Sequence, residues 1–431
     1  MTTPNYIEDL KSQVQGYKQR GRAILENLED YISSSGIELT EGEREQLGLI
    51  NKRTCKRRFS VQDVADLVGM SRSSIHRYID LGEIPDRPTR ETNGRTVKLG
   101  YTLEQVWEIR QKLGRLPKRD RMAIVGFLNQ KGGVGKSTKS WMFGQYMALR
   151  GFRVLYVDTD PQASLSFLLG YRPRTDVGYW DTFAPFLLQD IEGAEEEFGD
   201  GGKVSDLRYC IRPTHWPNID IIPACNDLLE LEVQSDHIMH GSPNTYESLT
   251  GIQLNSPMDL LRNGVERLGD DYDVVIFDGT PSVNTSTMNI FSTCDAVVAP
   301  VPCGMLDFNS SVEFCAMIEE ILDSYIEHGI NPPLPQLHFL LAKFHNNAPS
   351  RFMEVLIRKT FTNALLTHYA TASDEIQKHS TSFRSVYEIN TADTNNSKAL
   401  KRTREEYDAL FEEIRTTVLA PIMNDRYAAR I

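Results

Sequence analysis

The stretch Phe127-Leu128-Asn129-Gln130-Lys131-Gly132-Gly133-Val134-Gly135-Lys136-Ser137-Thr138 decides the fold expected for this chain. It follows an apolar run and precedes a helical pattern. Its glycines let the backbone curl so that N–H groups face a chain of phosphates at the positive end of the next helix. In such a loop the lysine before Ser137 faces the β- and γ-phosphates, and the serine hydroxyl is offered to Mg²⁺. The residues predicted to bind the nucleotide are Gly132, Gly133, Val134, Gly135, Lys136, Ser137 and Thr138.

Short apolar runs that alternate with helical patterns continue to the end of the chain. Most of these runs are almost uninterrupted, as is typical of strands buried on both faces of a parallel sheet. They predict a doubly wound, mostly parallel α/β domain over residues 121–431. Two polar stretches, 189–202 and 235–257, are expected to be surface insertions. The strands are predicted at 123–129, 153–158, 219–223, 274–278, 296–301 and 336–342.

The glycine-rich loop departs from the ordinary P-loop pattern, which requires glycine where this chain has Gln130. The sequence K-G-G-V-G-K-S-T instead resembles the deviant Walker A motif of the ParA/MinD family. The resemblance implies a P-loop ATPase that uses ATP/ADP and Mg²⁺. It also implies that Lys131 reaches across a dimer interface to the partner's nucleotide and that Lys136 is the lysine facing the phosphates.

Two further motifs resemble the same family. A strand ends in D-x-D-P-Q, with Asp158 and Asp160, and another apolar strand ends at Asp278 like a Walker B motif. By this resemblance Asp160 positions or deprotonates the attacking water, while Ser137, Asp158 and Asp278 hold the metal. A carboxylate near the γ-phosphate is what water orientation requires. Gly279 departs from the family's usual D-x-P-P continuation.

Charge is unevenly distributed along the 431 residues. The net charge is −12, yet residues 52–121 carry 17 Lys and Arg against 9 Asp and Glu. A basic block inside an acidic protein is the electrostatic footprint of a DNA-binding module. The alternative is a solvated basic face on a helical bundle.

The same block has the spacing of a helix-turn-helix. Ser60 precedes a helix to residue 68, a Gly69 turn follows, and Ser71 caps a second helix over 72–80. A hairpin is predicted at 88–92 and 95–99 and a third helix at 102–113, so residues 37–120, with their linker, resemble a winged helix-turn-helix. The side chains predicted to contact DNA are Arg72, Ser73, Ser74, His76, Arg77, Arg95 and Lys98.

The N-terminal segment is expected to be one helix over about residues 4–35. Apolar side chains recur at alternating spacings of three and four, which is the seam of a coiled coil. Domain 1–36 is therefore predicted to dimerise, with packing on its own chain as the alternative. The positions of the seam are Ile7, Leu10, Val14, Tyr17, Gly21, Ile24, Leu28 and Tyr31.

A basic run opens the last helical pattern. Large partition ATPases resemble this layout and use basic residues there for sequence-independent DNA binding. An equally open alternative is a set of cations on a solvated helix, partly paired with Glu405 and Glu406. The candidate DNA contacts in this run are Lys398, Lys401 and Arg402.

Taken together, the resemblance implies an ATP-dependent DNA segregation protein. It would be a homodimer, bind operator DNA and nonspecific nucleoid DNA, repress its own operon and respond to a ParB-type centromere-binding protein. No apolar stretch approaches membrane-spanning length and no signal peptide is apparent, so a cytoplasmic, nucleoid-associated protein is expected. The rivals are a MinD-like membrane-cycling ATPase, disfavoured by the acidic terminal helix, and a nucleotide-sensing transcription repressor.

Overall fold

The computed structural model describes residues 6–36, 38–39, 44, 53–92, 95–173, 175–189, 204–279, 285–380 and 383–424. The chain divides into two compact units, Met1–Asn51 and Lys52–Ile431. Several sequence predictions lie outside the described residues. These are the hairpin turn at 93–94, almost all of the acidic stretch at 189–202, and the turn after Gly279.

Residues 6–36, the continuous described part of the first unit, form two helices where one was expected, α1 (Tyr6–Glu26) and α2 (Leu28–Ser35). Asn27 separates them, because its side-chain amide donates to the Ala23 carbonyl at 2.9 Å and its backbone leaves the helical region. Gly36 ends α2 with a left-handed φ of 69°. Among the seam side chains that the structure describes, Val14, Tyr17, Ile24 and Tyr31 are exposed.

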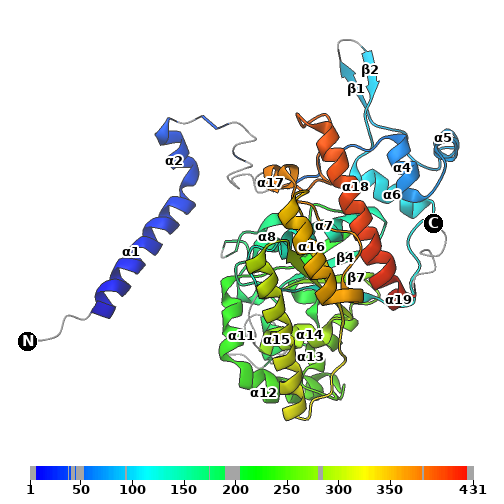
Figure 1. Ribbon diagram of the computed structural model, residues 1–431. Coiled ribbons are helices and arrows are strands. Elements are labelled where there is room, and N and C mark those ends of the chain that lie inside the picture. The colour runs from blue at the N-terminus through cyan, green and yellow to red at the C-terminus, as the bar shows by residue number, and fades with distance from the viewer. Residues whose placement is uncertain are drawn as a thin grey trace, which may run out of the picture. The chain divides into compact units, whose positions relative to one another are not determined.

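The second unit is built on a seven-stranded sheet (Figure 1). Its strand order is β5-β6-β4-β7-β3-β8-β9, and every pairing is parallel except that of β5 with β6. The predicted mostly parallel α/β sheet is confirmed, and β5 is an additional edge strand. The bounds are β3 (Ala123–Phe127), β4 (Val154–Asp158), β5 (Arg212–Pro213), β6 (Ile219–Ile222), β7 (Val274–Asp278), β8 (Ala296–Pro302) and β9 (Gln336–Ala342).

Helices cover both faces of this sheet. Alternate residues of each strand point to opposite faces, so each face contributes to its own hydrophobic core. Val274 and Ile276 belong to one hydrophobic core, whereas Val275 and Phe277 belong to the other. Among the described residues, no helix has the length and apolar character needed to cross a membrane. The helices are α7 (Lys136–Leu149), α8 (Ser164–Leu168), α9 (Ala184–Leu188), α11 (Glu230–Val233), α12 (Ser235–Thr250), α13 (Asp259–Glu266), α14 (Thr285–Thr293), α15 (Met305–Glu327), α16 (Ala348–Phe361), α17 (Asp374–Ser380), α18 (Ser397–Glu413) and α19 (Ala420–Met423).

The stretch 235–257 is not a surface insertion, and this prediction was wrong. Most of it forms α12, whose Ile238, Ser242 and Tyr246 are buried at a spacing of four residues. The Tyr246 ring lies 5.7 Å from the Phe186 ring of α9, in an edge-to-face arrangement. The polar composition concealed a helix with one buried stripe.

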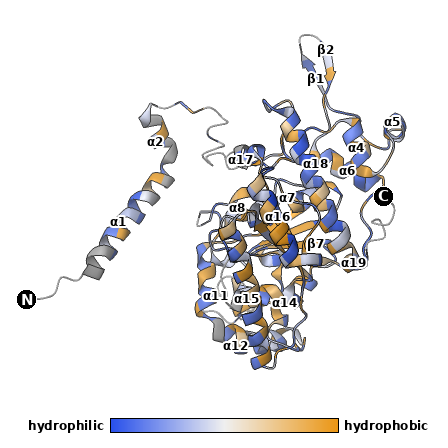
Figure 2. Cartoon of the chain, viewed as in Figure 1, coloured by the Kyte–Doolittle hydropathy of each residue, from blue (hydrophilic) through white to orange (hydrophobic). Residues whose placement is uncertain are grey.

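The basic block forms α4 (Val61–Val68), α5 (Arg72–Asp80), the hairpin β1 (Thr89–Thr92) with β2 (Arg95–Lys98), and α6 (Leu103–Lys112). Capping boxes at Ser60 and Thr102 start α4 and α6, and Ser71 caps α5. The hairpin is largely hydrophilic, in contrast to the apolar strands of the sheet (Figure 2). Residues 59–109 contribute to the same hydrophobic core as α7 and α18, so the block is part of the larger body.

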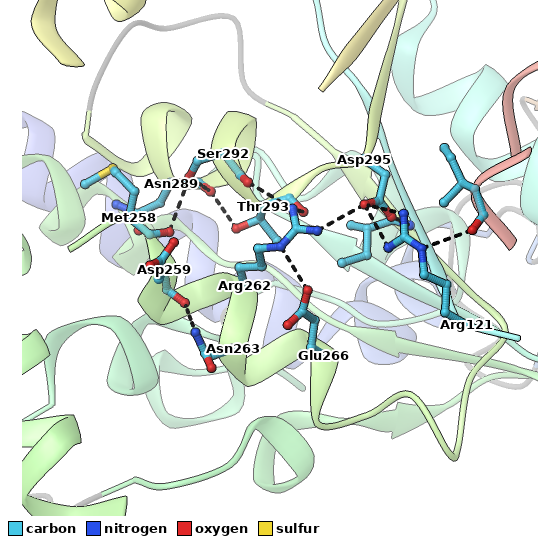
Figure 3. A network of polar contacts seen from close by, with 12 residues as sticks. Arg121, Met258, Asp259, Arg262, Asn263, Glu266, Asn289, Ser292, Thr293 and Asp295 are labelled. Carbon is cyan, nitrogen blue, oxygen red and sulfur yellow. Dashed lines mark hydrogen bonds and ion pairs between the residues drawn. The ribbon is translucent and has the colours of Figure 1, made fainter. Parts of the chain in front are cut away.

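Two buried carboxylates hold the amino edge of the sheet, where the strands begin. Asp295 accepts from Arg121 and from Arg262 of α13, each at 3.1 Å (Figure 3). Asp273 accepts from Arg119 at 2.6 Å and from Arg153 at 2.9 Å. These four arginines tie the strand starts to neighbouring helices and loops.

Candidate nucleotide-binding site

The glycine-rich loop connects β3 to α7 at the carboxyl edge of the sheet, where ligands bind in open α/β folds. Gly133 and Gly135 have left-handed φ values of 73° and 87°, which side-chain-bearing residues rarely adopt. Asn129, which the sequence analysis did not single out, fixes the start of the loop. Its amide donates to the Pro300 carbonyl at 2.7 Å, and its Oδ1 accepts from the Lys131 backbone at 3.0 Å.

Lys136 is buried at the first position of α7, and its side chain points back toward the loop. Its Nζ donates to the Lys131 carbonyl at 3.1 Å. Burial lowers the pKa of Lys136, while the charges of Asp278 and Asp160 oppose that shift. The lysine therefore shares its environment with two of the predicted carboxylates. Ser137 and Thr138, the next two residues, are half-buried.

The three predicted carboxylates gather around the loop. Asp158 and Asp278 are paired in register at the ends of β4 and β7, and Phe127 at the end of β3 is paired with Asp278. Both carboxylates are buried. Burial and the negative charge of Asp278 raise the pKa of Asp158, and burial above all raises the pKa of Asp278.

The protein treats these two carboxylates differently. Asp158 accepts hydrogen bonds from the Ser166 hydroxyl at 2.7 Å, the Ser166 backbone at 2.8 Å and the Asp160 backbone at 3.2 Å. The Asp278 carboxylate accepts no backbone hydrogen bond among the described residues, and the side chains of Ser137, Ser140 and Lys136 favour its charged form. A buried carboxylate with so few partners is costly unless a cation lies nearby. Asp278 thus fits a divalent cation better than Asp158 does.

Asp160 lies just beyond β4 and is only partly buried. Its Oδ1 accepts from the Gln162 backbone at 2.8 Å, and its carbonyl accepts from the Ala163 backbone at 2.7 Å. Ala163 has a left-handed φ of 53°, an uncommon conformation for alanine. The tight turn holds the carboxylate beside the loop.

Lys131 forms an ion pair with Asp307 in the first turn of α15. Both side chains are about one third exposed. The two residues are far apart in sequence, and no motif marked Asp307. The pairing therefore could not have been found from the sequence pattern.

Two other lysines were also missed. The Nζ of Lys139 is fully buried, lies 3.5 Å from the carbonyls of both Val134 and Gly135, and has its pKa lowered by burial to about 8. The Nζ of Lys343, just after β9, donates to the Gly133 carbonyl at 2.6 Å. A lysine three positions after Lys136 was a possible signal for the first, whereas nothing marked the second.

The residues predicted to contact DNA fall into two sets. In the front block, Arg72, Ser73, His76, Arg77 and Arg95 are exposed. Ser74 is half-buried and its backbone bonds to the Ser71 cap at 3.1 Å, whereas Lys98 is paired with Asp86 at 2.6 Å.

The second set lies on α18 and is partly neutralised. Lys398 is exposed in its first turn. Lys401 faces Glu405 at 3.8 Å, and Arg402 faces Glu406 at 2.8 Å. The pairing proposed as the alternative for this run is therefore present for two of its three candidate residues.

The sheet and its glycine-rich loop define a P-loop protein of the α/β class. Residues 122–331 match a family described as an AAA domain. The chain is 31% identical over 343 residues to Protein SopA of Escherichia coli (strain K12), covering 78% of this chain and 82% of SopA. It is 24% identical over 324 residues to Plasmid partition protein A of Escherichia coli, covering 72% and 76% of the two chains.

A solved structure named Partition Protein has the same fold, with a TM-score of 0.57 and 19% identity, covering 92% of this chain and 98% of that one. The chain belongs to the ParA-type family of partition ATPases, of which SopA is a member. The resemblance inferred from the loop and the two carboxylate motifs is confirmed.

Proposed function

We propose that this protein is an ATP-dependent DNA segregation ATPase that binds ATP or ADP with Mg²⁺ at residues 132–138. One observation carries the proposal: the buried Asp278 carboxylate shares its environment with Lys136 and Ser137, beside a loop whose glycines shape it for phosphate. The names of the relatives, which concern plasmid partition, support the biological role.

Each residue of the site has a proposed task. The backbone N–H groups of the loop and the Lys136 ammonium bind and orient the phosphates. Ser137 and Asp278 hold Mg²⁺, and Asp158 supports its shell while anchoring Ser166. Mg²⁺, when bound, neutralises charge that develops on the phosphates. Asp160 orients the attacking water or accepts its proton.

The active species is proposed to be a homodimer. Lys131 would leave Asp307 and reach the partner's nucleotide, which makes hydrolysis depend on dimer closure. The exposed apolar seam of α1 and α2 gives residues 1–36 a surface for a second copy of the chain.

Residues 37–120 are proposed to be a winged helix-turn-helix domain that binds an operator and represses the partition genes, in front of an ATPase domain at 121–431. Its second helix, α5, exposes Arg72, Ser73, His76 and Arg77 for phosphates and base edges. Arg95 in the hairpin would contact the backbone. Ser74 and Lys98 are weaker candidates because each already has a partner.

Nonspecific DNA binding is proposed to use Lys398, Lys401 and Arg402 in an ATP-bound dimer. Two such patches joined in one dimer raise avidity without new contacts. Hydrolysis, stimulated by a ParB-type partner, would release the DNA. This cycle would operate in the cytoplasm on the nucleoid.

Nucleotide binding and turnover test the core of this proposal. Lys136→Ala should abolish ATP binding, because it removes the cation facing the phosphates. Lys131→Ala should bind ATP and lose hydrolysis and dimer closure, and Asp160→Ala should bind ATP and hydrolyse it poorly. If Lys131→Ala lost binding as completely as Lys136→Ala, the role of Lys131 across the dimer would be refuted.

The two DNA activities should separate. Arg72→Ala or Arg77→Ala should weaken operator binding by about 1–3 kcal/mol and spare ATP-dependent binding to random duplex. The Lys401→Ala, Arg402→Ala double variant should show the reverse.

The affinity for random duplex should rise with MgATP. In a plot of log affinity against log salt concentration, the slope should be about −0.9 for each phosphate contact. If affinity and salt slope were the same with ATP, with ADP and without nucleotide, the proposed ATP-gated DNA cycle would be refuted.

A further inference from the structure

Three consecutive carbonyls of the P-loop face lysine ammonium groups. The Gly133 carbonyl accepts from Lys343 at 2.6 Å, and those of Val134 and Gly135 each lie 3.5 Å from the Nζ of Lys139. One lysine comes from α7 and the other from the end of β9. Two separate elements therefore converge on the loop.

Both lysines are held there by local features. A Cβ added to Gly135 would lie 2.8 Å from the Lys139 Nζ, so the glycine leaves room for the ammonium as well as adopting a left-handed φ. Lys343 itself has a left-handed φ of 50° without being glycine. Such a conformation carries strain and persists where its surroundings impose it.

The buried charge of Lys139 is not balanced by the protein. Among the described residues Lys139 forms no ion pair although its side chain is buried, and the neighbouring charge of the exposed Lys343 disfavours its charged form further. A buried cation without a counter-ion is costly unless an anion binds nearby. The anion that this loop is shaped for is a polyphosphate.

We propose that Lys139 and Lys343 are two further nucleotide-positioning residues, which act through the P-loop backbone. They hold the carbonyls of Gly133, Val134 and Gly135, which leaves the loop N–H groups free for the nucleotide. Their charge also offsets that of the bound phosphates. The inference rests on the proposed function, since it concerns the same ATP site. It differs from the role of Lys136, because neither lysine needs to touch the γ-phosphate.

The test compares Lys139→Met and Lys343→Met with wild type for equilibrium binding of MgATP and MgADP. Each variant should weaken both nucleotides by about tenfold, because the loop contacts phosphates that the two share. The turnover number at saturating MgATP should change by less than about threefold. Lys343→Arg, which keeps the charge and a donor, should bind as wild type does.

Lys359→Met is the matched control, because Lys359 is exposed on α16. Thermal unfolding without nucleotide shows whether the variants are folded, and if Lys139→Met is not, Lys343→Met decides the outcome. Wild-type affinity for both nucleotides in the methionine variants would overturn the inference. That result would leave the proposed function intact provided that Lys136→Ala fails to bind, whereas a wild-type protein that binds no nucleotide would overturn both.

Discussion

The two edges of the central sheet bury carboxylates in opposite ways. At the amino edge, Asp273 and Asp295 are each paired with two arginines, and Figure 3 shows the two arginines of Asp295. At the carboxyl edge, Asp278 is also buried but has no arginine partner among the described residues, and only Lys136, Ser137 and Ser140 favour its charged form. Removing a charge from water is costly, and pairing it with hydrogen-bonded cations offsets that cost. One edge is complete within the protein, whereas the other is completed by a ligand.

The cations at the two edges differ in the same way: one has carboxylate partners and the other has none. Arg262 at the amino edge is half-buried and bridges Asp295 and Glu266. Lys139 at the carboxyl edge is buried without a counter-ion among the described residues. Buried charges of both signs therefore collect at one edge. This edge can bind a metal ion and a polyphosphate together.

The largest expected effect is at Asp278. Asp278→Asn should lower MgATP turnover about 100-fold, because metal-assisted charge stabilisation contributes several kcal/mol and each 1.36 kcal/mol is tenfold. Phosphate release under saturating MgATP measures it. The free energy of unfolding without nucleotide should not decrease, since the substitution removes a charge that burial disfavours, as the raised pKa of Asp278 indicates. Chelating Mg²⁺ should lower wild-type turnover to a similar level, and a strongly destabilised variant would contradict the comparison.

The next effect is at the amino edge and concerns stability. Asp295→Ala should lower the free energy of unfolding by about 2–3 kcal/mol, because it removes a charged acceptor from Arg121 and Arg262 and leaves Arg262 with only the half-exposed Glu266 as an ion-pair partner. Denaturant unfolding measures this loss. Asp271→Ala is the control, because the Arg208–Asp271 pair is half-exposed and should contribute at most about 1 kcal/mol. Equal losses of unfolding free energy in the two variants would mean that burial does not determine how much these ion pairs contribute to stability.

The sequence predicted the carboxyl edge better than the amino edge, and the reason is physical. Phosphate binding imposes a fixed local spacing, so the loop, Asp158, Asp160 and Asp278 were all found at the site. Asp307 and Lys343 contribute through contacts between distant segments, which leave no periodicity or motif. Local capping also predicted α4 and α6 well, since Ser60 and Thr102 act within one turn. For α12 the polar composition outweighed a weak helical stripe, and the prediction was wrong.

Another buried carboxylate, Glu388, gives a smaller effect and a test of pH dependence. Glu388 accepts from Trp216 and the Ser385 backbone, each at 2.9 Å, and from His215. Although burial raises the pKa of Glu388, the charge of His215 and these hydrogen bonds lower it overall. Its stabilisation is therefore present above the unfolded pKa, about 4.3, and is lost as pH falls through the folded value. Glu388→Gln should cost about 1–3 kcal/mol at neutral pH.

Unfolding of this variant and of wild type across pH measures the difference. The gap between the two proteins should narrow below about pH 4, where Glu388 takes up a proton. A gap that is constant from neutral to acid pH would show that the charge of Glu388 contributes nothing.

The smallest expected effect is at Asp307, which lies at the carboxyl edge but is only partly buried. The Lys131–Asp307 pair is about one third exposed, so it should contribute at most about 1 kcal/mol. If Lys131 must leave Asp307 to reach a partner's nucleotide, Asp307→Asn removes the free-energy cost of breaking that ion pair. The ATP concentration for half-maximal dimerisation should then fall by at most about fivefold, the equivalent of 1 kcal/mol. Sedimentation across an ATP series measures it. The free energy of unfolding should change by no more than the same amount. Weaker dimerisation in Asp307→Asn would mean that Asp307 helps to present Lys131 and does not restrain it.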